Sequence, residues 1–391
     1  MDPIANPYVP NAGAMPPALP GRESLLDAFS TALARIKLGR AAKSLLPYGL
    51  RGVGKTVLLR RFVKEARVKG YLTGLIEADE STKFIPALAD ELRRILFILD
   101  TPAKVHALAK RAMRIFKSFT VTAGLEGLSM SLGVDGERGF GDSGDVGTDL
   151  STLFQAIGEA AREQDTAVLI AVDEVQYLAE AEFGALIKAI HHVTQEGLPV
   201  LVVATGLPQI LALAGEAKSY AERLFDFRAI GPLSEEDARE ALVAPAADAG
   251  VAFEDAAVRT VFEATRGYPF FLQEWAYNAW NEASGSSITK GDALNGEAIA
   301  LPKLDNGFFA VRYNRCTPSE KRYLRAMAEL GEGPFKSSDV ALKLSKTSNR
   351  LGPTRDALIK KGMIWSPEHG FIAFTVPLFD AFMRRKEPVF S

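Results

Sequence analysis

Residues 45–62 read LLPYGLRGVGKTVLLRRF, an apolar stretch that leads into a glycine-rich turn and then into a pattern with apolar residues at helical spacing. The turn fits the frame Gly-x-x-x-x-Gly-Lys-Ser/Thr at Gly49, Gly54, Lys55 and Thr56. Such a turn lets backbone N–H groups surround phosphate oxygens at a helix N-terminus, where the helix dipole favours negative charge. The sequence therefore predicts a strand, a phosphate-binding loop and a helix.

Each position of this loop has an expected role toward a nucleotide. Lys55 is expected to reach the terminal phosphates, and the Thr56 hydroxyl to hold Mg²⁺. The rest of the expected phosphate-binding set comprises Gly49, Gly52, Val53, Gly54 and Val57. The alternative is a turn that only caps a helix, with Lys55 as a surface lysine.

A pair of carboxylates follows a second predicted strand. Residues 166–178 read TAVLIAVDEVQYL, and the near-continuous apolar run is typical of a strand buried on both faces of a parallel sheet. Asp173 and Glu174 come at its end, where ligands of open α/β sheets bind. We expect Asp173 to hold Mg²⁺, directly or through water, and Glu174 to act as the general base. An exposed acidic pair without a role is the alternative.

A third apolar run, LPVLVVATG at residues 198–206, also ends in a polar side chain. Thr205 would lie where a neighbouring strand end can contact the attacking water or the γ-phosphate. We therefore count Thr205 among the catalytic candidates.

These motifs together resemble the AAA+ and STAND group of P-loop ATPases, in particular bacterial members related to origin-recognition and archaeal ATPases. PGRESLLDAF at residues 20–29 resembles the box that opens such domains, and TRGYPFFLQ at residues 265–273 resembles the Gly-x-Pro element of their lid. The resemblance implies an α/β P-loop core with a parallel sheet, a helical lid and a C-terminal winged helix-turn-helix. It also implies ATP and Mg²⁺ as ligands, with Arg22 and Pro269 near the nucleotide.

In that group an arginine often completes the site beside the γ-phosphate. SYAERLFDFRAI at residues 219–230 resembles the segment that carries it, which makes Arg223 the candidate. A homo-oligomer would let Arg223 act on a neighbouring subunit, but the sequence leaves open whether the protein is a monomer, a dimer, a ring or a filament. Arg223 on a solvated helix face is the alternative, because Arg228 lies close by and spacing cannot choose between them. Arg266 is a further candidate as an arginine that contacts nucleotide from the lid.

Four regions follow from these motifs: an irregular N-terminal arm (1–19), the ATPase core (20–230), a helical lid (231–300) and a winged-helix domain (301–391). Lys55 and Asp173 are farther apart in the sequence than a compact core of this group needs, which indicates an insertion near residues 92–147. Its pattern predicts a helical stretch over 92–116, then a hairpin and a loop over 117–145.

Composition limits the class of protein. The chain has 391 residues, 47% of them hydrophobic, and a net charge of −2, so it reads as globular and shows no overall attraction to nucleic acid. No apolar run reaches the length of a membrane span. Cys316 is the only cysteine, which excludes an internal disulfide framework and favours a cytoplasmic protein.

The C-terminal region predicts three helices and a hairpin. Thr317 to Glu320 reads as a capping box with Pro318 at the first helical position, Ser337 or Ser338 as the cap of a second helix, and residues 349–362 as a third helix. Residues 363–365 and 370–375 read as the two strands. In a winged helix the third helix would present side chains to DNA; the candidates are Lys346, Asn349, Arg350 and Arg355.

The sequence leaves two functions open. The first is a Mg²⁺-dependent ATPase that acts as a switch or motor on double-stranded DNA through its winged helix. The second is a STAND-like signalling ATPase whose winged helix and lid contact a protein partner and control oligomerisation. Both keep the same ATP site, and the C-terminal region discriminates between them.

Overall fold

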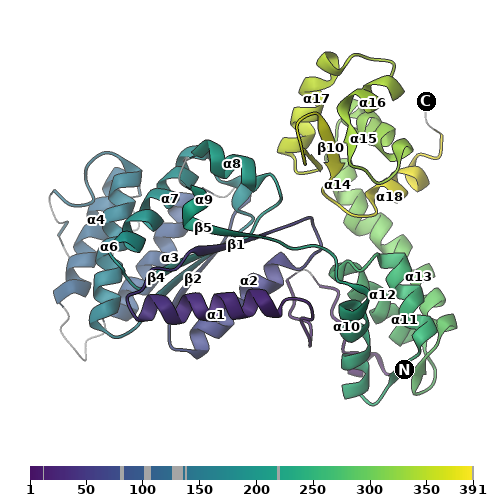
Figure 1. Cartoon of the computed structure of the whole chain (residues 1–391), viewed down its shortest axis with the longest axis horizontal. Helices are drawn as coiled ribbons and strands as arrows, with labels where there is room; N and C mark the ends of the chain where they lie inside the picture. Colours follow the sequence, from purple (N-terminus) through teal and green to yellow (C-terminus); the bar gives the residue numbers. More distant parts are fainter. Residues whose placement is uncertain are drawn as a thin grey trace.

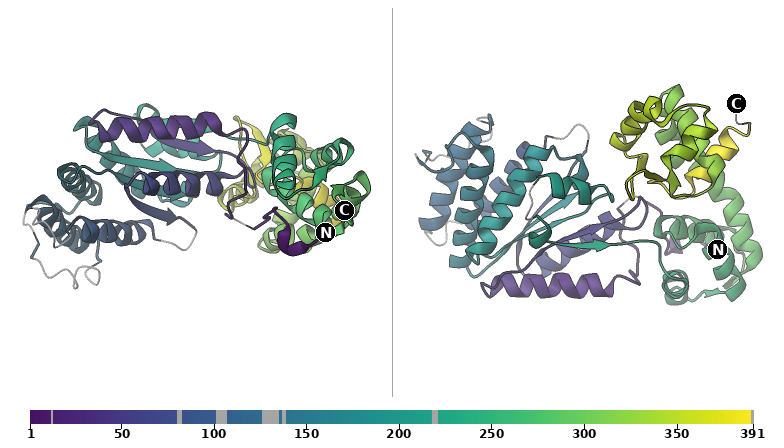
Figure 2. Two further views of the ribbon diagram at one scale, coloured as in Figure 1. Left: turned by 90° about the horizontal axis from the view of Figure 1, so that it is seen from below. Right: turned by 45° about the horizontal axis from the view of Figure 1, so that its top comes forward.

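A computed structural model describes residues 1–11, 13–79, 83–100, 107–125, 135–136, 139–217 and 221–389. Figure 1 shows three parts in chain order: an α/β core, a bundle of helices below the C-terminal region, and the C-terminal region itself. Both views of Figure 2 keep the core on one side and the other two parts together on the opposite side.

The core contains parallel strands whose carboxyl ends share one edge. The strands are β1 (Ser44–Tyr48), β2 (Leu72–Glu77), β3 (Val168–Asp173), β4 (Val200–Ala204) and β5 (Phe225–Ala229). β2, β3 and β4 pair in that order, and β1 pairs with β5. A parallel bridge between Tyr48 and Gly206 joins β1 to the end of β4. β4 thus lies between the strand that leads into the glycine-rich loop and the strand that ends in Asp173.

Helices bury both faces of this sheet. Leu169 and Ala171 pack with helices α1 (Glu23–Lys37) and α2 (Lys55–Val68). Val168, Ile170 and Val172 instead pack with the helices of the other face, α3 (Phe84–Leu99), α6 (Val146–Glu163) and α7 (Glu180–Gln195), and α4 (Ala107–Thr122) packs outside them against α6 and α3. Burial on both faces explains why the strand reads as a continuous apolar run. The strands predicted near residues 45, 167–172 and 198–206 are confirmed.

The predicted hairpin is wrong where the structure can be compared with it. Residues 117–122 belong to helix α4, because Ile115, Phe116 and Phe119 are buried at helical spacing while Val121 is exposed. The predicted helical stretch over 92–116 is divided between α3 and α4. Residues 126–134 and 137–138, which the predicted hairpin and loop also include, lie outside the described residues.

Short segments complete the core on either side of β4. A 3₁₀ turn, η2 (Val175–Tyr177), follows β3, and α8 (Ile210–Ala217) and α9 (Ala221–Leu224) connect β4 to β5. No helix in the described ranges combines the length and apolar character that crossing a bilayer would require.

The lid consists of helices α10 (Glu235–Asp248), α11 (Asp255–Thr265), α12 (Pro269–Glu282) and α13 (Lys290–Leu304). A short parallel pair, β6 (Ala252–Phe253) and β7 (Ser287–Ile288), links its loops. The N-terminal arm, with one 3₁₀ turn η1 (Pro3–Ala5), lies against the lid. Tyr8 anchors the arm, since its side chain is only 2% exposed and its hydroxyl donates to the Leu242 carbonyl.

A continuous helical stretch leads from the lid into the C-terminal region. α13 passes into a π-helical turn, η3 (Asp305–Phe309), and then into α14 (Ala310–Asn314). The predicted boundary between residues 300 and 301 lies inside α13, and the division into domains stays a prediction. We call residues 305–314 the junction.

The C-terminal region has the predicted order of elements. Helices α15 (Pro318–Leu330), α16 (Ser337–Lys343) and α17 (Ser348–Lys360) precede α18 (Phe379–Lys386). Strands β8 (Phe335–Lys336), β9 (Ile364–Trp365) and β10 (Phe371–Phe374) form an antiparallel sheet with β10 in the centre.

The capping box of Thr317 and Glu320 is confirmed at the start of α15. The predicted cap of the second helix is wrong: Lys336 is the N-cap, because it pairs with Phe371 as the last residue of β8 and the helix begins directly afterwards.

Candidate nucleotide-binding site

The glycine-rich loop connects β1 to the N-terminus of α2, as its sequence predicts. At Gly49, a Cβ atom would lie 2.1 Å from the Ile230 carbonyl oxygen, so any larger residue would clash with the backbone after β5. Gly54 has φ of 93° and is the N-cap of α2. These glycines permit a close approach and a left-handed turn, and both position the N–H groups at the start of the helix.

Lys55 begins α2 and folds back over the loop. Its Nζ atom donates hydrogen bonds to the carbonyl oxygens of Gly49 and Leu50, each at 3.0 Å. The side chain is buried, and this burial lowers the pKa of its ammonium. This buried cation hydrogen-bonds to two carbonyl dipoles and is also attracted by the charges of Glu174 and Asp173, so it is suited to exchange the carbonyls for an anion of higher charge.

The two carboxylates after β3 have different environments. The Asp173 carboxylate is buried and accepts hydrogen bonds from the Thr205 hydroxyl and, at 2.9 Å, from the Glu174 N–H. Glu174 has φ of 53°, in the left-handed region, and its side chain lines the cavity beside the loop. Thr205 is directed toward Asp173 and does not line that cavity. β4 brings this hydroxyl to Asp173 because it is the strand next to β3.

Glu174 is contacted by two side chains that the sequence analysis did not predict, Gln176 and Arg51. Gln176 donates from Nε2 to the Glu174 carboxylate and accepts at Oε1 from the Leu207 N–H, at 2.9 Å. Arg51, inside the glycine-rich loop, lies with Nη1 3.9 Å from Glu174 Oε1. The position of Arg51 in the loop was a usable sequence signal. For Gln176, the only sequence signal was its position two residues after Glu174.

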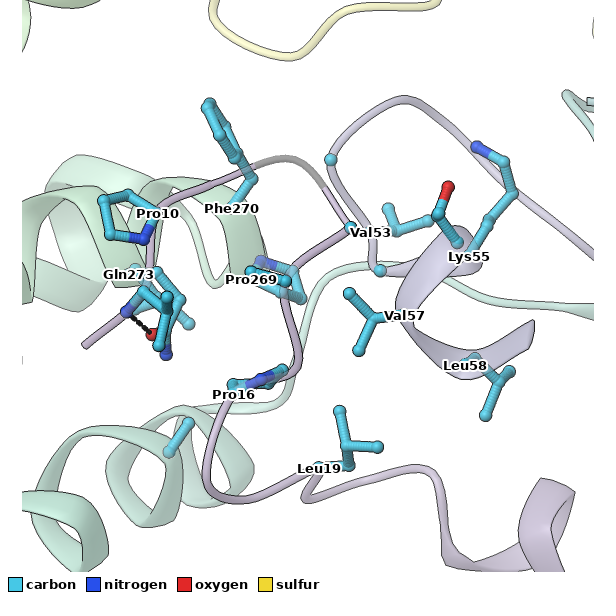
Figure 3. Close-up of a pocket in the computed structure, with 18 of the residues that line it drawn as sticks. Pro10, Pro16, Leu19, Val53, Lys55, Val57, Leu58, Pro269, Phe270 and Gln273 are labelled. Carbon is cyan, nitrogen blue, oxygen red and sulfur yellow. Dashed lines mark hydrogen bonds between the residues drawn. The ribbon is translucent and has the colours of Figure 1, made fainter. Parts of the chain in front are cut away.

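A cavity of about 460 Å³ brings the loop, Glu174, the lid and the arm together. Figure 3 shows Val53, Lys55, Val57 and Leu58 on one side, with lid and arm residues opposite. The arm lines much of this cavity, which the sequence did not indicate; its lining residues are Val9, Pro10, Asn11, Gly13, Ala14, Pro16, Ala18, Leu19 and Pro20. The Val9 N–H donates to Gln273 Oε1 at 2.9 Å, which ties the arm to the lid at the cavity wall (Figure 3).

The lid contacts the loop through the Gly-x-Pro segment. A Cβ atom at Gly267 would lie 2.4 Å from the Leu233 carbonyl oxygen, which explains the glycine. The Phe270 N–H donates to the Gly52 carbonyl at 3.1 Å, and Pro269 and Phe270 both line the cavity. The Gly-x-Pro segment is thus built to bring the start of α12 onto the phosphate loop.

Arg22 links the phosphate loop to the start of the lid. Its Nη2 atom donates to the carbonyls of Gly231, at 2.7 Å, and Val53, at 3.3 Å, and burial lowers the pKa of its guanidinium. Because Gly231 lies between β5 and the lid, this arginine links the phosphate loop to the point where the lid begins.

The arginines predicted to complete the site lie away from the cavity. Arg223 is exposed on α9, and Arg228 pairs with Asp226 at 2.8 Å. Arg266 pairs with Glu332 of the C-terminal region at 2.5 Å. None of the three lines the cavity. A different arginine, Arg312 of the junction, lines it, and nothing in the sequence pointed to it.

The oxygen donors near the loop suit Mg²⁺. Within the described ranges, no three histidine, cysteine, aspartate or glutamate side chains gather as a self-contained metal cage. Mg²⁺ does not need one, because it usually takes one or two carboxylates together with substrate phosphates and water. The Asp173 carboxylate and the Thr56 hydroxyl are hard donors of this kind, and they fit the ion.

The candidate DNA contacts lie around the start of α17. Lys346, Asn349 and Arg350 are exposed, while Arg355 pairs with its neighbour Asp356 at 3.1 Å. These residues share one exposed part of the C-terminal region, away from the cavity. Their role stays a prediction.

Comparison with known proteins identifies two parts of the chain. Residues 18–203 match the family described as AAA ATPase domain, and residues 306–383 match a domain of unknown function, DUF8462. A comparison with curated protein sequences found no match.

The solved structures that match this chain have low sequence identity to it and TM-scores below 0.5. The RuvB Holliday junction branch migration motor of Thermotoga maritima is 17% identical, with a TM-score of 0.45, over 90% of this chain and 92% of that one. Orc1 of Aeropyrum pernix, in complex with DNA, is 15% identical with a TM-score of 0.46, over 95% and 94%. Cdc6p of Pyrobaculum aerophilum is 15% identical with a TM-score of 0.47, over 99% of each chain.

Proposed function

We propose that this protein is a Mg²⁺-dependent ATPase whose nucleotide state controls its C-terminal region, and the match of residues 18–203 to the AAA ATPase domain family supports this. The observation that carries the proposal is the shared cavity. It collects Gly52, Gly54, Lys55, Thr56 and Glu174 under the lid and the arm. A phosphate loop and a carboxylate facing the same space are what phosphoryl transfer to water requires.

Each role in the proposed hydrolysis is assigned to residues of this chain. The loop N–H groups and Lys55 bind and orient the polyphosphate, and Thr56 and Asp173 hold Mg²⁺, which neutralises developing charge on the phosphates when bound. Glu174 takes the proton of the attacking water. Thr205 orients Asp173 through its hydrogen bond, and Gln176 orients Glu174.

ATP hydrolysis tests this proposal directly. Wild-type protein should release phosphate from ATP only with Mg²⁺, and Glu174→Gln should bind ATP but turn it over at least about 100-fold more slowly, as expected for loss of a general base. Glu182→Gln, a change on α7 outside the cavity, is the matched control. Equal turnover by Glu174→Gln and the wild type would move the base elsewhere.

The C-terminal region serves as a winged helix that binds double-stranded DNA in this proposal. Its support is the order of helices and the central strand β10, together with exposed Lys346, Asn349 and Arg350 near the N-terminus of α17. In a winged helix, this third helix enters the major groove and lysine or arginine side chains contact phosphates. Mobility shift of duplex DNA in ATP, in ADP and without nucleotide is the test.

A signalling role through protein contacts is the second candidate, favoured by two observations. Lys361 donates to Glu320 at 2.7 Å, and Arg355 pairs with Asp356, so part of the basic charge of this region is already compensated. If the wild type binds no duplex at low salt in any nucleotide state, the second candidate replaces the first.

An oligomer in which Arg223 acts on the neighbouring subunit's ATP belongs to the same proposal. Its exposed position on α9 leaves the guanidinium accessible to another chain. Mixing Arg223→Ala with Lys55→Ala protein should then restore turnover that neither variant has alone. Absence of rescue, with activity independent of concentration, would indicate a self-contained monomer.

A further inference from the structure

Arg312 of the junction reaches into the nucleotide cavity from outside the ATPase core. It belongs to α14, the helix between the lid and the C-terminal region, yet it lines the same cavity as Lys55, Thr56 and Glu174. The core alone therefore does not complete this cavity, because a side chain from much later in the chain forms part of its wall.

The Arg312 guanidinium is held in place by the junction and the lid. Nη1 donates to the Phe308 carbonyl at 2.6 Å, and the guanidinium carbon lies 4.1 Å from the centre of the Phe308 ring. That ring stacks on Phe270, with ring centres 4.9 Å apart, and the Phe270 N–H is bonded to Gly52 of the phosphate loop. The stack fixes Arg312 relative to the loop, as a preorganised contact requires.

The Arg312 side chain is half-buried, where an arginine usually has a carboxylate partner. In the part of the chain that the structure describes, no aspartate or glutamate forms an ion pair with it. Burial, and next the neighbouring charge of Arg51, lowers the pKa of Arg312 to about 10. The positive charge is thus retained at neutral pH but costs free energy, which an anion in the cavity would recover.

Other cationic side chains lie near Arg312. A second cavity of about 160 Å³ shares Arg51 and Arg312 with the first and is also lined by Lys361. The carboxylates that face this group are Glu174, 3.9 Å from Arg51, and Glu320, bonded to Lys361. Arg315 also lines the second cavity, so Arg51, Arg312, Arg315 and Lys361 bring four cationic side chains to this point, which favours a ligand group with more than one negative charge.

We propose that Arg312, assisted by Arg51, contacts the terminal phosphate of ATP within the same chain and distinguishes ATP from ADP. This inference rests on the proposed ATPase function. It gives Arg312 a contact within the same chain, as the sequence offered to Arg266, and it is separate from the contact of Arg223 with a neighbouring subunit's ATP. Since Arg312 lies on the junction, loss of the terminal phosphate removes a contact between the core and the helix that enters the C-terminal region.

The test compares the affinities for ATP and ADP. Arg312→Gln keeps a donor for the Phe308 carbonyl but loses the charge, and Arg322→Gln, at an exposed arginine of α15, is the matched control. Equilibrium titrations with fluorescent ATP and ADP analogues and Mg²⁺ should give about 10- to 100-fold weaker ATP binding by Arg312→Gln, the range of a charge-assisted contact, and nearly unchanged ADP binding. Thermal unfolding without nucleotide checks the fold.

Each other outcome is decisive. Equal losses for ATP and ADP, or no loss, would overturn the role of Arg312 while leaving the ATPase proposal intact. A wild type that binds neither nucleotide would overturn both. If Arg312→Gln does not fold, Arg312→Lys decides: it keeps the charge but not the planar fork, so its preference for ATP over ADP should fall below that of the wild type, and an unchanged preference would refute the contact.

Discussion

The backbone N–H of Arg51, inside the phosphate loop, donates a hydrogen bond to the Thr375 carbonyl of the C-terminal region at 3.0 Å. The Arg51 side chain also reaches this region: its Nη2 atom donates to the Tyr177 hydroxyl of the core at 3.0 Å and would lie 3.1 Å from a Cβ atom at Gly362 of the C-terminal region. The loop that is proposed to bind phosphate is therefore also hydrogen-bonded to the C-terminal region. We therefore expect a change in the loop's ligand to act on this contact.

Lys55→Ala should weaken ATP binding by about 10- to 100-fold, because the polyphosphate loses a buried, charge-assisted donor. The fold should persist, since burial already disfavours this charge and the residue hydrogen-bonds only to loop carbonyls. Titration with a fluorescent ATP analogue measures the effect, and Lys64→Ala, at an exposed lysine of the same helix, is the control. Unchanged affinity in Lys55→Ala would leave the loop as a helix cap only.

Gln176→Ala should lower kcat between about 10- and 100-fold and leave ATP affinity nearly unchanged, because a small misplacement of a general base is costly to the chemical step. The variant removes the donor to Glu174 and the acceptor for Leu207. Steady-state kinetics together with an ATP titration separate the two effects. Gln195→Ala, exposed at the end of α7, serves as the control. A loss of affinity with kcat retained would contradict a positioning role.

Arg350→Glu combined with Arg355→Glu should weaken duplex DNA binding and flatten its salt dependence, by about one unit of slope for each phosphate that the protein no longer neutralises. ATP hydrolysis without DNA should survive, since both residues lie away from the cavity. Arg40→Glu with Arg259→Glu, at exposed positions of the core and the lid, makes the same change in net charge. If both double variants lose DNA affinity equally, the effect comes from net charge and α17 is not the contact surface.

Tyr8→Ala should destabilise the protein by about 3–5 kcal/mol and also weaken ATP binding, because the arm that lines the cavity loses its buried anchor. Tyr8 packs edge-on to Phe253 and Trp280, with ring centres 6.4 Å apart in each pair. Tyr8→Phe, which removes only the hydrogen bond to Leu242, should cost about 1 kcal/mol and keep ATP affinity. Urea unfolding followed by tryptophan fluorescence gives the free energies. Full ATP affinity in Tyr8→Ala would exclude the arm from the binding site.

The sequence by itself determined the elements whose signals are local. The glycine frame with Lys55, the apolar run that ends in Asp173 and the capping box at Thr317 depend on residues close together in the chain, and each element forms where it was predicted. Local signals also misled: the sequence predicted a hairpin from residue 117 onward, but residues 117–122 are helical because α4 buries one face against α6 and α3. Periodicity over so few residues does not discriminate between the two.

Only the tertiary structure decided which distant residues share the cavity. Thr205 meets Asp173 because β4 is inserted beside β3, and the arm and Arg312 reach the site because the lid and junction fold over the loop. Such meetings depend on strand order and on the packing of whole helices, which no short pattern encodes. Arg223 had the sequence signal and is exposed, whereas Arg312 had none and lines the cavity half-buried, because the path of the chain, and not the motif, sets where a guanidinium lies.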